Sequence, residues 1–174
     1  WFKQAGDRIA LIGPDAVSLG GSEYLATFGR RLAGRPAPLD LRLERDVQAA
    51  CRAAIEAGLV SSAHDAADGG VAVALAEACM GGPEALGVEV ELVSLGRHDL
   101  TLFGEGPSRI VVSVPPRAQR HFESLMGEYR VPWRFIGTVG GGRLTLKVGG
   151  SVVVSLSLDQ VSHAWRTGFE RYVA

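Results

Sequence analysis

The stretch SAHDAADGGVAVALAEACM, residues 62–80, places a charged, glycine-rich turn directly before an apolar segment. The run that ends near Ala63 predicts a strand, and the segment from Val71 predicts a helix that ends at the glycine pair Gly81 and Gly82. The turn between them holds one histidine, two aspartates and two glycines. This strand, turn and helix predict a sheet with helices packed against it.

The rest of the chain shows the same kinds of pattern. From Leu43 to Ile55 the apolar residues keep helical spacing, and Gly58 follows where a left-handed cap belongs. Helices and strands alternate at first, and a run of strands with glycine turns comes late, so we expect an α/β or α+β fold with helices on a mixed sheet. The predicted strands are residues 8–13, 59–64, 87–93, 109–114 and several between 134 and 158, and the predicted helices are residues 22–34, 43–55, 70–82, 115–126 and 158–172.

The bulk composition indicates a globular chain without a strong electric field. The 174 residues fit a single domain, residues 1–174, and 47% of them are hydrophobic. Eighteen Lys and Arg residues balance nineteen Asp and Glu residues, which gives a formal net charge of −1. Such a balance does not attract nucleic acid or an anionic membrane, so we expect neither as a partner.

The cysteines and the first residues of the chain give expectations about its cellular location and about its place in a longer protein. Cys51 and Cys79 lie in alanine-rich helical segments without metal-ligand spacing, which favours buried, reduced thiols in a cytoplasmic protein. No apolar run approaches the roughly 20 residues that a membrane span needs. The chain begins with Trp1 and enters strand-like sequence almost at once, so we expect it to be a fragment of a longer multidomain chain.

The turn of the opening stretch has two interpretations. If Asp68 is the N-cap of the following helix, the amides of Gly69, Gly70 and Val71 point out of the helix start and can bind an anion such as phosphate. His64 and Asp65 then lie at the carboxyl end of a strand, where a carboxylate can hold magnesium bridged to phosphate. The structural alternative is that Asp68 caps, Asp65 makes a local turn and His64 is a partly buried imidazole. Residue types alone slightly favour the structural interpretation.

A second glycine-flanked turn lies in LFGEGPSRIVVSV, residues 102–114. Gly104 and Gly106 flank Glu105, which allows the backbone to present Glu105, Ser108 and Arg109 on one rim. Arginine suits phosphate or carboxylate because of its planar fork of donors. The alternative is an ordinary loop closed by an ion pair between Glu105 and Arg109. Two such turns in one domain favour a shared ligand surface.

Other glycine-rich segments carry less information. LGGSEYL, residues 19–25, lacks the lysine of a phosphate-binding P-loop, so we expect its glycines to allow close packing and Ser22 to cap a helix. The sequence contains no HExxH, GxSxG or GxGxxG motif, and we assign no catalytic residue.

The quoted stretches, together with IGTVGG at residues 136–141, occur in an order that resembles the last domain of the large subunit of phosphoribosylformylglycinamidine synthase. The resemblance covers the whole chain. It implies a three-layer α/β/α architecture with a mixed sheet, like the C-terminal domain of aminoimidazole ribonucleotide synthetase. Two related ATP-using enzymes, aminoimidazole ribonucleotide synthetase and selenophosphate synthetase, remain alternatives, as does a non-catalytic nucleotide-binding module.

The resemblance also implies roles for the two turns. Asp65 matches a metal-binding aspartate, and Glu105, Gly106 and Pro107 match a substrate-binding Glu-Ser-Gln segment. Because Gly106 and Pro107 lack the polar side chains of that segment, the resemblance implies an auxiliary nucleotide pocket in a mainly structural domain. The residues assigned to nucleotide binding are His64, Asp68, Gly69, Gly70, Glu105, Ser108 and Arg109, with Asp65 as the metal ligand.

The family converts formylglycinamide ribonucleotide to formylglycinamidine ribonucleotide in purine biosynthesis, with ATP, magnesium and ammonia from glutamine. Membership would make this chain part of a carbon–nitrogen ligase and inactive as an isolated fragment. The implied partners are the remaining domains of the synthase, a glutaminase subunit and a small accessory subunit.

Overall fold

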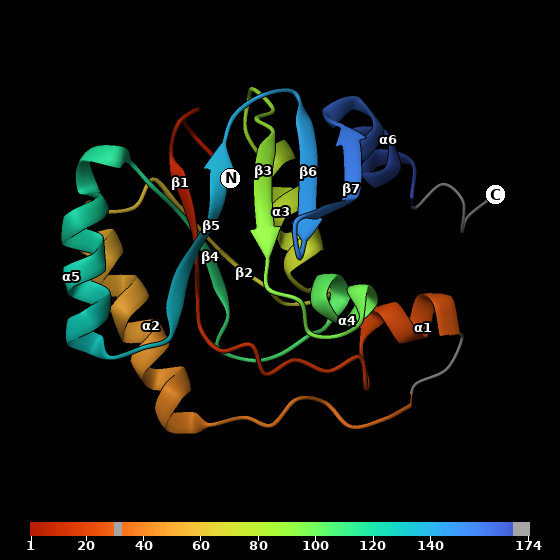
Figure 1. Ribbon diagram of the computed structural model, residues 1–174, viewed down its shortest axis with the longest axis horizontal. Coiled ribbons are helices and arrows are strands. Elements are labelled where there is room, and N and C mark those ends of the chain that lie inside the picture. The colour runs from red at the N-terminus through yellow and green to blue at the C-terminus, as the bar shows by residue number, and fades with distance from the viewer. Residues whose placement is uncertain (30–32, 169–174) are drawn as a thin grey trace.

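The computed structural model describes residues 1–29 and 33–168, and its strands form a seven-stranded mixed sheet (Figure 1). The strand order is β2-β4-β1-β5-β3-β6-β7. Neighbouring strands are antiparallel except for β3 and β6, which are parallel. The strands are β1 (Arg8–Ile12), β2 (Ser62–Asp65), β3 (Val88–Leu92), β4 (Ile110–Val114), β5 (Trp133–Val139), β6 (Arg143–Val148) and β7 (Ser151–Ser157).

Helices lie on both faces of this sheet. The helices are α1 (Glu23–Gly29), α2 (Leu41–Glu56), α3 (Gly70–Met80), α4 (His98–Phe103), the 3-10 turn η1 (Pro116–Ala118), α5 (Gln119–Tyr129) and α6 (Leu158–Thr167). In β1, Ile9 and Leu11 join the core beneath α3 and α6, whereas Ala10 and Ile12 join the core beneath α2 and α5. Strand geometry explains this alternation, because successive side chains point to opposite faces. The predicted three-layer α/β/α architecture is therefore confirmed.

Most predicted elements are confirmed. In β3 the alternation of buried valines with exposed glutamates places one face in the core and leaves the other in water. Helix α2 buries Val47, Ala50, Cys51 and Ala54, and Asp40 caps it by accepting hydrogen bonds from the Arg42 and Leu43 amides. The late glycine-rich run forms β5, β6 and β7, as expected.

Several local predictions differ from the structure. The N-cap of α3 is Gly69 in a left-handed conformation, so the prediction that Asp68 caps this helix is wrong. Strand β2 begins at Ser62, three residues after the predicted start, and the short helix α4 was not predicted. The final helix extends over Leu158–Thr167, and the Phe169 and Tyr172 positions of the prediction lie outside the described residues.

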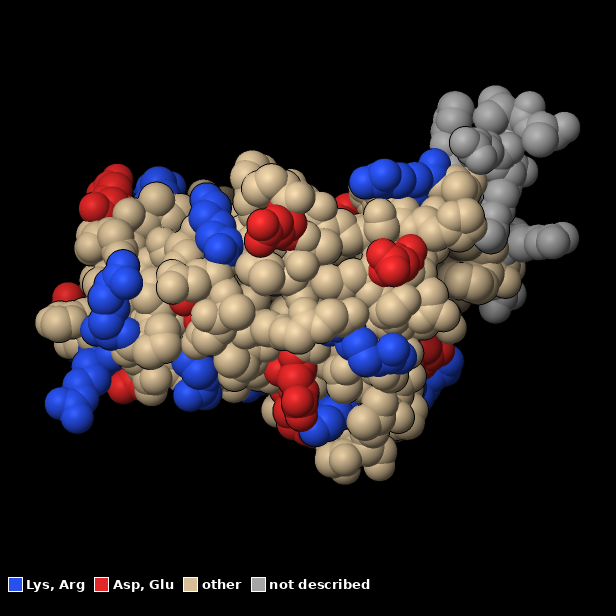
Figure 2. Space-filling model, turned by 90° about the horizontal axis from the view of Figure 1, so that it is seen from above, with Lys and Arg blue, Asp and Glu red and all other residues tan. Residues whose placement is uncertain are grey.

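The surface agrees with the balanced composition. Figure 2 shows charged side chains of both signs scattered among uncharged ones on the face seen from above. On that face the described residues do not form the continuous basic stripe that is typical of nucleic-acid binding. No helix in the described part of the chain has both the length and the apolar composition to cross a membrane.

Candidate functional site

The two glycine-rich turns meet at one end of the sheet. The Oε1 atom of Glu105 accepts a hydrogen bond from the Gly69 amide at 2.9 Å. Two hollows adjoin at this point and share Ala67, Gly106 and Pro107 in their walls. Asp65 lines the larger hollow and Asp68 lines the smaller one. The turns that the sequence singled out therefore converge on a common rim.

Glycines make this convergence possible, because they allow one backbone to approach the other. A Cβ atom on Gly70 would lie 2.7 Å from the Gly104 carbonyl oxygen, and Gly70 has a φ of +67°. A Cβ atom on Gly106 would lie 2.4 Å from the Ala16 carbonyl oxygen. No real side chain tolerates such distances, so the two turns can meet only with glycine at position 70, and the Glu105 turn can lie against Ala16 only with glycine at position 106.

The helix amides predicted to be free are already bonded within the chain. The Gly69 amide donates to Glu105, and the Gly70 amide donates to the Ala67 carbonyl oxygen at 3.1 Å. The same Oε1 atom of Glu105 also accepts a hydrogen bond from the Glu23 amide, at 2.9 Å, at the start of α1. The carboxylate of Glu105 therefore fills the anion position at two helix starts.

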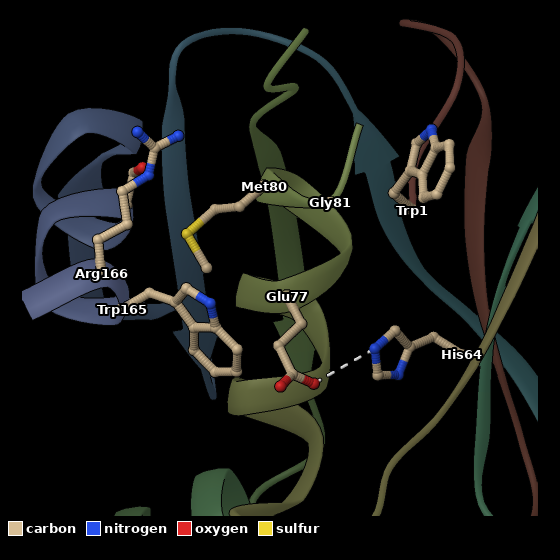
Figure 3. A pocket seen from close by; sticks show the side chains of 8 residues that line it. Trp1, His64, Glu77, Met80, Gly81, Trp165 and Arg166 are labelled. Atoms are coloured by element: carbon tan, nitrogen blue, oxygen red, sulfur yellow. Dashed lines mark ion pairs between the residues drawn. The ribbon is translucent and has the colours of Figure 1, made fainter. Parts of the chain in front are cut away.

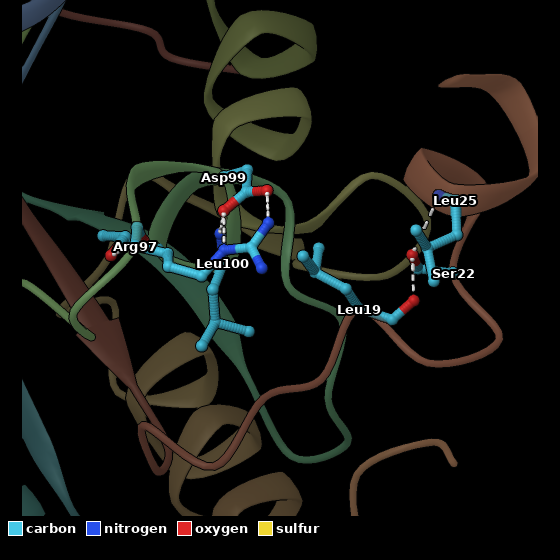
Figure 4. A network of polar contacts seen from close by, with 7 residues as sticks. Leu19, Ser22, Leu25, Arg97, Asp99 and Leu100 are labelled. Atoms are coloured by element: carbon cyan, nitrogen blue, oxygen red, sulfur yellow. Dashed lines mark hydrogen bonds and ion pairs between the residues drawn. The ribbon is translucent and has the colours of Figure 1, made fainter. Parts of the chain in front are cut away.

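Polar contacts fix the helices on either side of Glu105 (Figure 4). The Ser22 hydroxyl donates to the Leu19 carbonyl oxygen at 2.6 Å and accepts from the Leu25 amide at 3.3 Å, which confirms Ser22 as a cap of α1. At the start of α4, both Asp99 carboxylate oxygens accept hydrogen bonds from the Arg97 guanidinium. The hydrogen bonds from Arg97 lower the pKa of the Asp99 carboxyl. Helix α4 then leads directly into the Glu105 turn.

The larger hollow, here called the Asp65 pocket, has a volume of about 510 Å³. The Asp65 side chain is 77% exposed at its edge. On the opposite wall, the Ser108 hydroxyl donates to Glu44 Oε2, and Glu44 Oε1 accepts from Gln48. Glu44 belongs to α2, and no local sequence signal pointed to it, because 64 positions separate it from Ser108. The residues that matter here are Glu44, Gln48, Asp65, Pro107, Ser108 and Arg109.

Arg109 lines the same pocket but is not the exposed rim residue that the sequence predicted. Its exposed fraction is 5%, and its Nε and Nη1 atoms have no hydrogen-bond partner among the described residues. Burial lowers the pKa of the guanidinium to about 10; the charge of Asp15 raises that pKa and the charge of Arg134 lowers it. The alternative of an ion pair between Glu105 and Arg109 is not observed within the described chain. Arg109 is thus a buried cation, and two of its three guanidinium nitrogens lack an acceptor among the described residues.

His64 lies away from this pocket, although it precedes Asp65 directly. Successive strand residues point to opposite faces, and His64 lines a separate hollow between α3 and α6. Its Nε2 atom lies 3.2 Å from Glu77 Oε2. The structure therefore brings together Asp65, Ser108 and Arg109 in one pocket and Asp68, Gly69 and Glu105 beside it, but it does not bring His64 to them.

The described residues do not form a complete metal site. Across residues 1–29 and 33–168, no three His, Cys, Asp or Glu side chains gather in a way that could hold a metal ion. Asp65 nevertheless offers one accessible carboxylate. Magnesium commonly uses one or two protein carboxylates and takes its other ligands from water and phosphate. Asp65 therefore suits the role of one magnesium ligand. The described residues do not form a site that would bind the ion without further ligands from phosphate and water.

Comparisons with known proteins agree on the family of this domain. Residues 4–149 match the family described as "AIR synthase related protein, C-terminal domain". The chain is 45% identical to the phosphoribosylformylglycinamidine synthase subunit PurL of Moorella thermoacetica, and 46% identical to that of Synechococcus sp. strain JA-3-3Ab. These alignments cover 95% and 97% of the chain, and the chain spans 22% of the length of each relative.

Solved structures show the same fold. A PurLQS structure from Thermotoga maritima has a TM-score of 0.71 at 18% identity, over 92% of this chain and 27% of that one. The T. maritima PurL complex with ADP has a TM-score of 0.69 at 20% identity, over 92% of this chain and 26% of that one. The family match and the curated relatives confirm the resemblance found in the sequence. The chain belongs to the family of AIR synthase related protein C-terminal domains.

Proposed function

We propose that this chain is the C-terminal domain of a phosphoribosylformylglycinamidine synthase. The whole enzyme would use ATP and glutamine-derived ammonia to form formylglycinamidine ribonucleotide in purine biosynthesis. The synthase name of the curated relatives supports this reading over aminoimidazole ribonucleotide synthetase and selenophosphate synthetase. Within that enzyme the domain has a mainly structural role, and its Asp65 pocket binds the phosphate groups of a nucleotide.

The main support for phosphate binding is that Arg109 is buried and that two of its guanidinium nitrogens have no acceptor among the described residues. A buried guanidinium without acceptors is unfavourable, because desolvation of a charge is compensated only by a close partner. Phosphate oxygens match the planar donor fork of arginine, and a phosphate in the Asp65 pocket would supply the missing acceptors. Arg109 is 5% exposed and lines this pocket, so the pocket is the natural place for such a ligand.

Asp65 and Glu44 add negative charge to the same pocket. A phosphate there would be repelled by both carboxylates unless a cation lies between them. We therefore propose that the nucleotide binds with magnesium, with Asp65 as one ligand and phosphate and water as the others. The ion would neutralise phosphate charge, while Arg109 binds and orients the phosphate group.

The domain supplies no catalytic residue in this proposal. The carboxylate of Glu105 is engaged by two backbone amides, and His64 lies in a separate hollow. Catalysis would depend on the other synthase domains, with a glutaminase subunit and a small accessory subunit as further partners. Two buried free cysteines fit a cytoplasmic location.

Calorimetric titration of the chain with Mg·ADP tests the proposal. We expect Arg109→Met to weaken binding by about tenfold or more, because a charged hydrogen-bond donor is lost. Asp65→Asn should remove the dependence on magnesium. Arg120→Met is the matched control, since Arg120 is exposed on α5 and changes the net charge equally. Equal affinities of the wild type and Arg109→Met, or no binding by the wild type, would overturn the nucleotide pocket.

A further inference from the structure

A second hollow, of about 520 Å³, lies between α3 and α6 (Figure 3). It shares no lining residue with the Asp65 pocket. We call it the tryptophan hollow. The residues that line it include Trp1, His64, Glu77, Met80, Trp165 and Arg166. A volume of this size matches small-molecule sites, which commonly measure about 300–1,000 Å³.

The walls of the tryptophan hollow expose aromatic surface. Trp1 is 51% exposed and Trp165 is 62% exposed. The third tryptophan of the chain, Trp133, packs edge-on against Phe122 and Phe135 in the opposite core. Indole rings left in water retain large apolar faces on which a planar ring can stack. The Met80 thioether beside Trp165 adds a polarizable apolar contact (Figure 3).

Two polar side chains, His64 and Glu77, lie together in the tryptophan hollow. The Nδ1 atom of His64 lies 2.8 Å from the Asp65 carbonyl oxygen, and its Nε2 atom lies 3.2 Å from Glu77 Oε2. This contact orients the Glu77 carboxylate, which Figure 3 shows between His64 and Trp165. No described residue donates a hydrogen bond to Glu77 Oε1. The hollow therefore presents a fixed acceptor beside an exposed aromatic face.

We propose that the tryptophan hollow binds a planar aromatic heterocycle with adjacent N–H donors. The ring stacks on Trp165, and its N–H groups donate to Glu77. A purely apolar ligand would desolvate Glu77 without supplying a hydrogen-bond donor. This site is independent of the phosphate-binding pocket.

Tryptophan fluorescence can test the site directly, because two of the three tryptophans line it. The Trp133→Phe variant leaves only the indoles of the hollow. We choose guanosine as the probe, since it carries adjacent ring and amino N–H groups and no phosphate. Inosine lacks the amino group, and ribose lacks the ring. We expect saturable quenching by guanosine, weaker binding of inosine and no effect of ribose.

Two substitutions locate the binding. Trp165→Ala should abolish most of the quenching, and Glu77→Gln should weaken guanosine binding by about tenfold. Glu128→Gln, an equal charge change at an exposed position of α5, should leave the affinity unchanged. Absence of saturable quenching would overturn the proposal, and so would equal affinity in Glu77→Gln or for inosine. Fluorescence that changes with protein concentration alone would also overturn it, because the indoles would then be covered by a second copy.

Discussion

The carboxylate of Glu105 lies 2.9 Å from the Gly69 amide and joins the Glu105 turn to the start of α3. The same oxygen binds the Glu23 amide at the start of α1, so one side chain connects three segments that are distant in sequence. The protein's own carboxylate therefore occupies the helix starts that a phosphate would otherwise favour. In the proposed nucleotide site, Arg109 rather than the glycine amides would therefore donate to the bound anion.

Removal of this carboxylate should destabilise the domain. Glu105→Ala leaves the Gly69 and Glu23 amides without their acceptor, and we expect the free energy of unfolding to fall by about 2–3 kcal/mol. Urea denaturation measures this loss. Glu128→Ala on the exposed side of α5 is the control and should change stability by less than about 0.5 kcal/mol. Similar losses in both variants would show that the Glu105 contacts contribute little.

Gly70 should be far less tolerant of substitution than Gly58. Both have left-handed backbones, with φ values of +67° and +66°. A Cβ atom on Gly58 meets nothing within 4 Å, whereas one on Gly70 meets the backbone of Phe103 and Gly104. We expect Gly58→Ala to cost about 1 kcal/mol of backbone strain and Gly70→Ala to cost about 3 kcal/mol or more. Thermal and urea unfolding of the two variants measure these losses. Equal losses in Gly58→Ala and Gly70→Ala would mean that the two turns are not closely packed at Gly70.

Arg109→Met should make the free domain more stable while it weakens nucleotide binding. The substitution replaces a buried guanidinium lacking partners at two nitrogens with an apolar side chain of similar length. Replacement of a buried charge by a well-packed apolar group often raises stability, here by about 1–2 kcal/mol. The Arg120→Met control should leave stability nearly unchanged. A marked loss of stability in Arg109→Met would indicate that the folded domain itself relies on this charge.

Both cysteine thiols should be unreactive in the folded chain. Cys51 and Cys79 are buried, and burial raises the pKa of both thiols, that of Cys79 to about 12. A disulfide reagent such as DTNB at pH 8 should label neither thiol in native buffer and both in urea, because the reactive thiolate forms only after exposure. Rapid labelling without urea would place a cysteine at the surface.

The raised pKa of Cys79 also predicts how stability depends on pH. The thiol ionises at its ordinary value of 9.0 in the unfolded chain, but near 12 in the folded chain. Between these values the folded state binds more protons, so the free energy of unfolding should fall as pH rises through this range. The loss attributable to Cys79 is about 1 kcal/mol by pH 10. Urea unfolding of the wild type and of Cys79→Ala at pH 8 and pH 10 measures this contribution. The free energy of unfolding should fall further between the two pH values in the wild type than in Cys79→Ala, and the excess is the contribution of Cys79.

The sequence predicted features that depend on local patterns. The alternation in residues 87–93 and the apolar spacing in residues 43–55 each define which face is buried, and both elements form as expected. Ser22 caps α1 because its hydroxyl reaches the amide three residues later. The sequence also indicated that the turns at Asp65 and Glu105 are close, because each combines glycine with a carboxylate.

The errors came from contacts between distant residues. Asp68 has the ordinary chemistry of an N-cap, but Gly69 occupies the N-cap position, and its amide donates to Glu105, 36 positions away. Arg109 resembled a surface residue, but its exposed fraction is 5%, and the charges of Asp15 and Arg134, both distant in sequence, act on it. His64 was assigned to the nucleotide site by its position beside Asp65, although strand alternation turns the two side chains apart. The contacts of Glu105 and Arg109 cannot be predicted from local spacing, whereas the opposite directions of His64 and Asp65 follow from the local alternation of a strand.

The place of β1 within the sheet has a consequence for how the chain is made. Among the seven strands β1 comes first in sequence, yet its two neighbours are β4 and β5, so Arg8 pairs with Val114 and with Thr138. During translation β1 has neither of these partners until β4 is made, and Ile110, which pairs with Ile12, lies 98 residues further along the chain. Its apolar residues, Ile9 to Ile12, must stay out of wrong associations throughout that interval. Such long-range closure slows folding and prolongs the time for which this apolar segment of the nascent chain is unpaired.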